Sequence, residues 1–418
     1  MSKELIAAVA AFASVQAFAE WTFDPTARTL TGDDGVVLNA VAVSSAERTL
    51  RITGVADLNG VDRIDLSTPV TSSGDEWRIV WISNKSFMNR PTIVSVTLPD
   101  TLEIIGESAF DGASSLVAVS PFLPGSVTNI GQKAFLNAPV SGALRLSNPL
   151  LREVPMQCFN VSNEVARITS VDMSGSGVLS IGQKAFLQQT NIVSVMLSDG
   201  LEVLDTGAFW NCYSLRDVVP FLPAHVRVVG GRAFSGAPVS GTLTASSRNL
   251  TTIGENAFDV GDDALPFSKI EAVDLAKSGV ESVNVYAFRG QRRLSEIKFP
   301  ATLATVGDYS FKNCTNLTHV YYSNDFGAGF ASAAKPFDGA IKRSKQLTIH
   351  VLRGLSSWES YMSGHGRSLT EEEVAEFVST HPGERIPVAL VPYPYETSTT
   401  LAYLSYWSLG TGLSIFIR

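Results

Sequence analysis

Short segments of alternating apolar and polar residues recur along most of the chain. One is "TIVSVTLP", residues 92–99, in which Val96 and Leu98 are predicted to point inward and Ser95 and Thr97 outward. Alternation with a period of two is typical of a β-strand with one buried face. Segments such as "NIVSVMLS" and "NLTHVYYS" repeat this pattern. The sequence therefore predicts many short strands separated by turns.

A second motif alternates with these strands. The hexapeptide "IGQKAF" occurs twice, at residues 130–135 and 181–186, and variants of it recur throughout. Aligning them on the final phenylalanine gives eleven units spaced by 23–30 residues, which indicates a solenoid of stacked repeats. The aligned residues are Phe87, Phe110, Phe135, Phe159, Phe186, Phe209, Phe234, Phe258, Phe288, Phe311 and Phe337.

A longer period is superimposed on the first. "PFLP" occurs at residues 121–124 and 220–223, and "APVSG" at 138–142 and 237–241, each pair 99 residues apart. The intervals between phenylalanines also repeat at this offset. The pattern indicates that a block of four units was duplicated.

The fold class follows because a single unit is too small to bury its own apolar residues. A unit of this size leaves its phenylalanine and its strand residues exposed, whereas stacked units bury both in continuous ladders. We predict a β-rich superhelix of about eleven units, with one parallel sheet and short helical or 3₁₀ turns that bury the phenylalanines. At about 4.8 Å per strand the stack would be roughly 50 Å long.

The units resemble a known repeat family. "LEVLDTGAFWNCYSL" at residues 201–215 and "LATVGDYSFKNCTNL" at 303–317 are similar to the BspA-like class of leucine-rich repeats, including Cys212 and Cys314 three residues after the phenylalanine. Most other units replace this cysteine, and the unit ending at Phe159 lacks the glycine. The resemblance covers about residues 81–352. It implies a leucine-rich-repeat solenoid of a secreted or surface-attached protein that adheres to host or matrix proteins.

The N-terminal residues resemble an export signal followed by a cap. Residues 1–19 combine Lys3, an apolar stretch and the small residues Ala17 and Ala19 around Phe18, which favours a signal peptide over a buried helix. A secreted or cell-surface protein is therefore expected. Residues 20–80 alternate like strands but lie outside the repeat, and we expect them to form a β cap over the open end of the solenoid, partly covered by Trp21 and Trp77.

The C-terminal region, residues 353–418, is non-repeating. "SLTEEEVAEFVSTH" predicts a helix with a capping box formed by Ser368 and Glu371. The uncharged tail at 401–417 has two interpretations. It is either a pair of C-terminal strands, which we favour, or a membrane anchor at the lower limit of length.

Composition excludes several classes of protein. The chain has 418 residues, 45 % hydrophobic and 17 % charged, with a net charge of −8 and no basic run, which argues against nucleic-acid binding. Of its three cysteines, Cys212 and Cys314 occupy equivalent positions four units apart, about 19 Å along the stack. A disulfide requires Cα atoms within about 7 Å, so buried free thiols are predicted for these two and for Cys158.

Catalytic and metal-binding motifs are not recognisable. The histidines at 225, 319, 350, 365 and 381 fall in no known catalytic or zinc-binding pattern. The acidic pairs at residues 33–34 and 262–263 are more consistent with solvated turns than with calcium loops. We therefore predict a protein without enzymatic activity, cofactor or metal.

The outward residue of each predicted strand forms a ladder on the sheet face. Most of its members are small or polar, but Lys298, Tyr321 and His350, with the neighbouring His319, fall on three adjacent strands. This composition is typical of binding hot spots, although an ordinary solvated sheet face has the same appearance. We predict adhesive binding of a protein or glycan there. The alternatives are a structural protein that self-associates in an envelope, and an enzyme with its chemistry in the C-terminal region.

Overall fold

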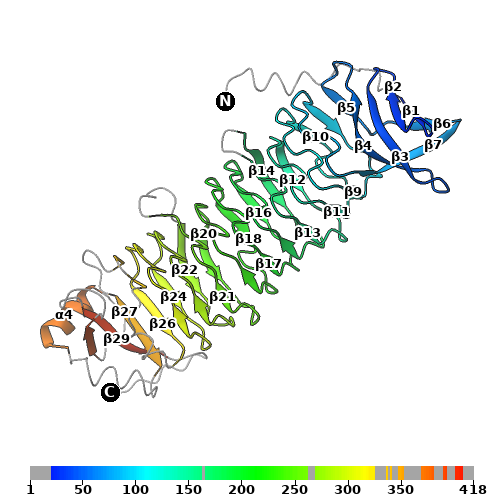
Figure 1. Cartoon of the computed structure of the whole chain (residues 1–418). Helices are drawn as coiled ribbons and strands as arrows, with labels where there is room; N and C mark the ends of the chain where they lie inside the picture. The colour runs from blue at the N-terminus through cyan, green and yellow to red at the C-terminus, as the bar shows by residue number, and fades with distance from the viewer. Residues whose placement is uncertain are drawn as a thin grey trace.

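The protein is an elongated stack of turns with a cap at its N-terminal end (Figure 1). The structure, a computed structural model, describes residues 20–161, 165–261, 269–324, 336–337, 339–340, 347–352, 369–380, 389–392 and 401–407. The predicted signal peptide (1–19), the acidic pair at 262–263, and the histidines at 365 and 381 lie outside these residues.

The N-terminal end is built from longer strands, most of which pair antiparallel. Trp21 is 1 % exposed, and the rings of Phe23 and Trp77 lie 5.2 Å apart, so both tryptophans contribute to its apolar interior. The strands are β1 (Trp21–Asp24), β2 (Thr29–Gly32), β3 (Val37–Ser44), β4 (Thr49–Asp57), β5 (Arg63–Asp65), β6 (Val70–Ser72) and β7 (Asp75–Ile82).

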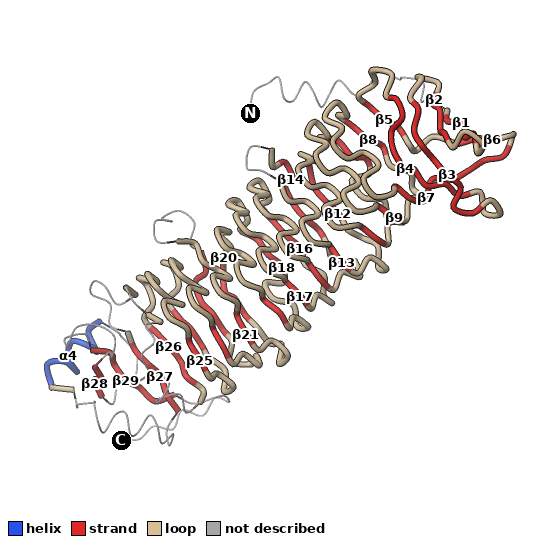
Figure 2. Tube along the Cα trace, viewed as in Figure 1, coloured by secondary structure: helices blue, strands red, loops and turns tan. Residues whose placement is uncertain are grey.

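From β8 to β25, each turn beyond the cap contributes one longer and one very short strand, and Figure 2 shows both running across the rod. The longer strands form what we call the long-strand row. It contains β5 and then β8 (Ser95–Thr97), β10 (Ala118–Ser120), β12 (Ser141–Arg145), β14 (Arg167–Asp172), β16 (Ser194–Met196), β18 (Asp217–Val219), β20 (Ser240–Thr244), β22 (Lys269–Asp274), β24 (Glu296–Lys298), β26 (His319–Tyr322) and β27 (Thr348–Leu352).

The two-residue strands form a separate short-strand row. It contains β9 (Ile104–Ile105), β11 (Asn129–Ile130), β13 (Glu153–Val154), β15 (Ser180–Ile181), β17 (Val203–Leu204), β19 (Val228–Val229), β21 (Thr252–Ile253), β23 (Ser282–Val283) and β25 (Thr305–Val306). Both rows pair in parallel. The predicted repeat solenoid is confirmed, but the expectation of one parallel sheet is wrong, because the residues before the motif glycine also pair from turn to turn.

The cap and the solenoid are continuous. β7 pairs in parallel with β9, which aligns Ile82 with Ile105, and β5 pairs in parallel with β8, which aligns Ile64 with Val96. Both rows therefore start within the cap, which closes the end of the apolar interior without interrupting its ladders.

The long-strand row is interrupted at two equivalent places, between β10 and β12 and between β18 and β20. Each interruption follows a copy of "PFLP", whose Phe122 or Phe221 packs against two ladder phenylalanines. The register then shifts at Gly142 in one block and at Gly241 in the other. The two blocks related by 99 residues thus share these irregularities as well as their motifs.

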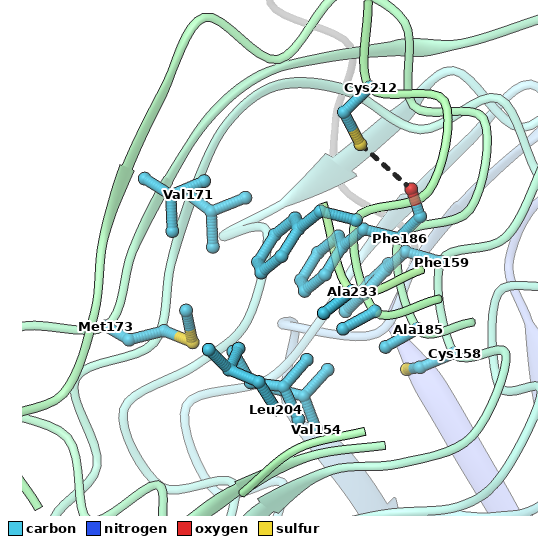
Figure 3. Packing of buried hydrophobic residues seen from close by; sticks show 14 of the residues in the cluster. Val154, Cys158, Phe159, Val171, Met173, Ala185, Phe186, Leu204, Cys212 and Ala233 are labelled. Carbon is cyan, nitrogen blue, oxygen red and sulfur yellow. Dashed lines mark hydrogen bonds between the residues drawn. The ribbon is translucent and has the colours of Figure 1, made fainter. Parts of the chain in front are cut away.

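The aligned phenylalanines form one ladder along the whole solenoid. All eleven are fully buried, and each consecutive pair is stacked with ring centroids 5.1–5.4 Å apart and planes within 17° of parallel. The spacing is close to that of paired strands, so the backbone repeat sets the ring repeat. Figure 3 shows Phe159 and Phe186 within this ladder.

The three cysteines are free and buried, as predicted. Cys212 donates a hydrogen bond from Sγ to the carbonyl oxygen of Phe186 at 3.3 Å (Figure 3), and Cys314 does the same to Phe288. Cys158 occupies the position held by alanine in most other turns, directly before the ladder phenylalanine. The thiols are therefore core side chains of the repeat.

The segment that carries each phenylalanine is a turn and not a helix. The residue two positions before the phenylalanine has a left-handed backbone in most turns, with φ of 59° at Lys133 and 56° at Lys184. A left-handed residue ends any right-handed helical turn, so the expected helical or 3₁₀ turns are not formed. The preceding glycine has another role. A Cβ atom on Gly131 would overlap the backbone nitrogen of Glu107, so glycine lets successive turns approach closely.

The C-terminal region contributes a helix and two strands among the described residues: α4 (Glu371–Thr380), β28 (Ala389–Pro392) and β29 (Leu401–Trp407). β29 pairs in parallel with β27 and antiparallel with β28, so the start of the uncharged tail is a strand, as favoured above. The helix is confirmed, but its capping box is formed by Thr370 and Glu373, each donating its backbone N–H to the other side chain. Among the residues described, no helix is long and apolar enough to span a membrane.

Candidate binding surface

The predicted outward ladder is present on the long-strand row. Lys298 of β24 is the register partner of Tyr321 of β26, which is in turn the partner of His350 of β27. His319 occupies the other outward position of β26. All four side chains are half-buried, and the parallel register brings them onto one patch of the sheet face. We call Lys298, His319, Tyr321 and His350 the four-residue patch.

Ring stacking holds the centre of this patch. The rings of Tyr321 and His350 lie 4.1 Å apart and within 9° of parallel, and the Lys298 ammonium lies 5.6 Å from the centre of the Tyr321 ring. Directly opposed side chains on neighbouring parallel strands are close enough for such contacts. The tyrosine is therefore fixed between an imidazole and a cation, which lowers the conformational entropy that a partner would have to remove.

The two histidines are joined by a hydrogen bond. His319 Nδ1 and His350 Nε2 lie 3.0 Å apart, so one ring donates to the other. Burial, and then the neighbouring His319, lower the pKa of His350 from its usual 6.5 to about 3. His350 is therefore neutral at physiological pH, and Lys298 contributes a positive charge to the patch.

The structure adds Glu296 to the patch, which the sequence reasoning had missed. Its carboxylate lies 2.6 Å from the Lys298 ammonium, and both side chains are about one third exposed. Glu296 lies two residues before Lys298 on β24, so strand alternation places both on one face and was a usable signal. The patch thus offers a cation, a carboxylate, two imidazoles and a phenol within a small area.

An exposed apolar pair lies further along the same face. Met196 and Val219 are register partners on β16 and β18, and they are 45 % and 58 % exposed. The sequence places both in the outward ladder, but the extent of their exposure comes from the structure. Apolar groups grouped on a surface favour protein contact, although two residues make a small patch.

A cleft also lies where the cap meets the first turn, away from the four-residue patch. It has a volume of about 380 Å3 and is lined partly by Trp77, Arg78, Thr97 and Asp100. The segments that form it are not adjacent in the sequence, so no local motif marks it. Its lining combines an aromatic ring with both charges and contains no histidine or cysteine.

A metal ion is bound by several His, Cys, Asp or Glu side chains that lie close together. Among the described residues, no group of three or more of them is arranged to hold an ion, and the histidine pair supplies two nitrogens. The acidic pair at residues 33–34 caps turns: Asp34 accepts from the backbone of Val36, and Asp33 from that of Glu20. The arrangement on the sheet face is suited to recognition by surface contacts.

Comparison with known families identifies the repeats. The repeat family described as "BspA type Leucine rich repeat region" matches this chain in six copies, over residues 81–216 and 259–329. The chain is a BspA-type leucine-rich-repeat protein. The matched ranges cover most of the solenoid and contain eight of the eleven ladder phenylalanines. A comparison with curated proteins gives no significant match.

Solved structures of other repeat proteins are similar to this BspA-type chain at low sequence identity. A leucine-rich cell-surface protein of Faecalibacterium prausnitzii is 18 % identical, covers 79 % of this chain and 96 % of its own, and has a TM-score of 0.42. A leucine-rich-repeat protein of Bacteroides ovatus is 14 % identical over 88 % and 97 %, with a TM-score of 0.40. The pneumococcal vaccine antigen PcpA is 12 % identical over 80 % and 96 %, with a TM-score of 0.35. The family assignment rests on the repeats and not on these superpositions.

Proposed function

We propose that this protein is exported and binds another protein through the long-strand face of its solenoid, without cofactor or catalysis. The observation that carries the proposal is the four-residue patch, where Tyr321 is stacked on His350 beside Lys298. Tyrosine with cationic neighbours is enriched at the energetic centres of protein interfaces. Surface location is supported by the signal-like residues 1–19 and by relatives described as a cell-surface protein and a vaccine antigen.

Recognition would depend on complementarity spread over several strands. Because the sheet is rigid and the patch is already ordered, a partner gains contact area at a small entropic cost. Glu296 and Lys298 supply opposite charges at the rim of the patch, which would fix the orientation of the partner more than its affinity.

The test is binding of the chain from residue 20 onward to a panel of purified extracellular-matrix proteins, followed by substitution. For a partner that binds, Tyr321→Ala and Lys298→Ala should each weaken affinity, the tyrosine by about thirtyfold. Thr97→Ala, on the same face near the cap, is the matched control and should change little. Equal affinity of the Tyr321→Ala variant and the unmodified protein would place the site elsewhere.

Self-association as an envelope component is the competing function, and the exposed Met196–Val219 pair favours it. Light scattering distinguishes the two. Concentration-dependent assembly that Val219→Ser abolishes, together with no binding to the panel, would support the structural function over the adhesive one.

A further inference from the structure

The edge of the solenoid that carries the phenylalanine turns has a charge pattern that is invisible in the linear sequence. Two positions on each turn lie at this edge: the one two residues before the ladder phenylalanine and the one directly after it. Most of the side chains there are exposed or half-buried, and Ser108, Ser235, Asn256 and Asp259 are buried. The backbone N–H at the first position donates to the next turn in every case from Lys85 to Tyr286, at 2.8–3.2 Å. These residues therefore stack in one straight column on the third side of the rod, away from both strand rows.

The first column is formed by the residues two positions before each ladder phenylalanine. It contains cations and no acid. Lys85, Lys133, Lys184 and Arg232 occupy alternate turns, which separates them by about 10 Å each. All four are at least partly exposed, and among the described residues none forms an ion pair within 4.0 Å. In a chain of net charge −8, a row of cations along one edge is a local reversal of charge, and only Lys133 has an electrostatic contact with a carboxyl group of this edge among the described residues, that of Asp111.

Apolar and aromatic side chains lie beside these cations. The second column is formed by the residues directly after each ladder phenylalanine. It contributes Leu136, Leu187 and Trp210, all half-buried. The guanidinium of Arg232 lies 5.2 Å from the centre of the Trp210 ring. Gly207 lies between two of these side chains, since a Cβ atom there would be in van der Waals contact with Lys184 Cγ at 3.4 Å and with Trp210 at 3.5 Å. The edge thus places apolar and aromatic surface next to charge.

The C-terminal end of the edge continues the pattern with tyrosines. Tyr286 and Tyr309 are stacked 5.4 Å apart, Arg289 lies 4.6 Å over Tyr286, and Lys312 lies 5.6 Å from Tyr309. Arg289 is also paired with Asp259 at 2.6 Å. The two columns together contain six cations and two carboxylates, those of Asp111 and Asp259. The neighbouring column contains Glu107, Glu255 and Asp308, so the positive character is confined to a narrow strip.

We propose that this basic-aromatic edge binds a linear acidic polysaccharide that lies along the solenoid. Cations at regular intervals would pair with the carboxylate or sulfate groups of the chain, and the leucine and aromatic side chains beside them would pack against the apolar faces of its sugar rings. A spacing of about 10 Å suits a charge on every second sugar better than a phosphate on every nucleotide. This site is separate from the four-residue patch and does not depend on the protein-binding function.

The test uses the full chain and two polyanions, with neutral dextran as the blank. Hyaluronate supplies a carboxylate on every second sugar, and dextran sulfate supplies sulfates at higher density. We expect the protein to bind at least one polyanion, more weakly at high salt, and not to bind dextran. The edge variant replaces Lys85, Lys133, Lys184 and Arg232 with glutamine. It should lose about thirtyfold in affinity. Glutamine is suitable because Gln157 already occupies this column with φ of 55°.

The control removes the same charge elsewhere, with glutamine replacing the exposed residues Arg167, Arg216, Arg248 and Lys277. It should lose less than about threefold. Gln157→Lys fills a gap between two cations and should raise affinity about threefold, which tests the site even if the edge variant is unstable. The proposal is wrong if neither polyanion binds, if the two fourfold variants weaken binding equally, or if single-stranded DNA binds more tightly than either polysaccharide.

Discussion

The side-chain amide of Gln189 donates a hydrogen bond to the backbone carbonyl of Phe159, 2.7 Å away across one turn of the solenoid. Cys212 holds the equivalent position in the next turn and donates to Phe186 at 3.3 Å. Gln291 repeats the glutamine contact with Phe258. The cysteine of the repeat pattern is thus one of two residues that satisfy the same buried carbonyl, which explains why its replacement in these turns leaves the fold intact.

Removing this donor should be costly. Gln189→Ala leaves the Phe159 carbonyl buried without its side-chain donor and opens a cavity, so we expect a loss of about 2 kcal/mol in the free energy of unfolding. Gln189→Cys should lose less, because it keeps a donor and removes a buried amide oxygen that has no partner among the described residues. Urea unfolding measures both. The exposed Gln183→Ala is the control, and equal midpoints for all variants would contradict the assignment.

The motif glycine is predicted to be required for close packing of turns. Gly131→Ala forces a methyl group against the backbone of Glu107, and we expect a loss of about 3 kcal/mol or failure to fold. Gly125→Ala is a matched control, since its methyl group would meet only Ser147 Oγ, at 3.9 Å. That variant should be neutral or slightly stabilised. Thermal unfolding compares the two variants. Equal losses of stability for Gly131→Ala and Gly125→Ala would contradict the packing argument.

The three thiols should be unreactive in the folded protein. Burial raises the pKa of Cys158, Cys212 and Cys314 above the usual value for a thiol, and thiolate is the reactive form. We expect no labelling by iodoacetamide at pH 8 under native conditions and three labels per chain in urea. Mass spectrometry counts the labels. Rapid native labelling of any one cysteine would show that its turn opens or is misassigned.

Stability should fall in acid because of His350. Its pKa in the folded protein, about 3, is below the usual 6.5, so between these values the unfolded chain binds a proton that the folded chain does not. The contribution of His350 to the free energy of unfolding is therefore complete above pH 6.5. It is lost as the pH falls toward 3, by at most about 1.4 kcal/mol per pH unit. His350→Phe keeps a ring against Tyr321 but does not titrate. A denaturation series at several pH values should show a smaller slope for this variant; an unchanged slope would contradict the prediction.

Most of the fold was predictable from spacing. The eleven phenylalanines were placed in one ladder from their intervals alone, and every consecutive pair is stacked. The short-strand row was missed because a two-residue strand such as Ile104–Ile105 has no measurable period, and only pairing with its neighbours makes it a strand. The helical turns were wrongly expected because left-handed residues such as Lys133 are not marked by residue type.

Part of the four-residue patch was likewise predictable from the sequence, and part was not. Strand alternation and unit register sufficed to bring Lys298, Tyr321 and His350 together, since both are properties of sequence positions. The histidine hydrogen bond and the lowered pKa of His350 depend on side-chain packing and burial, which no single segment encodes.

The sequence by itself determined the repeat, its buried ladder and the residues that face outward on the longer strands, because these follow from periodicity. Only the tertiary structure decided which outward residues become neighbours on the turn edge. Lys85, Lys133, Lys184 and Arg232 are about fifty residues apart along the chain, and stacking brings each within about 10 Å of the next. Charge acts through space, so a basic surface emerged from a sequence without any basic run.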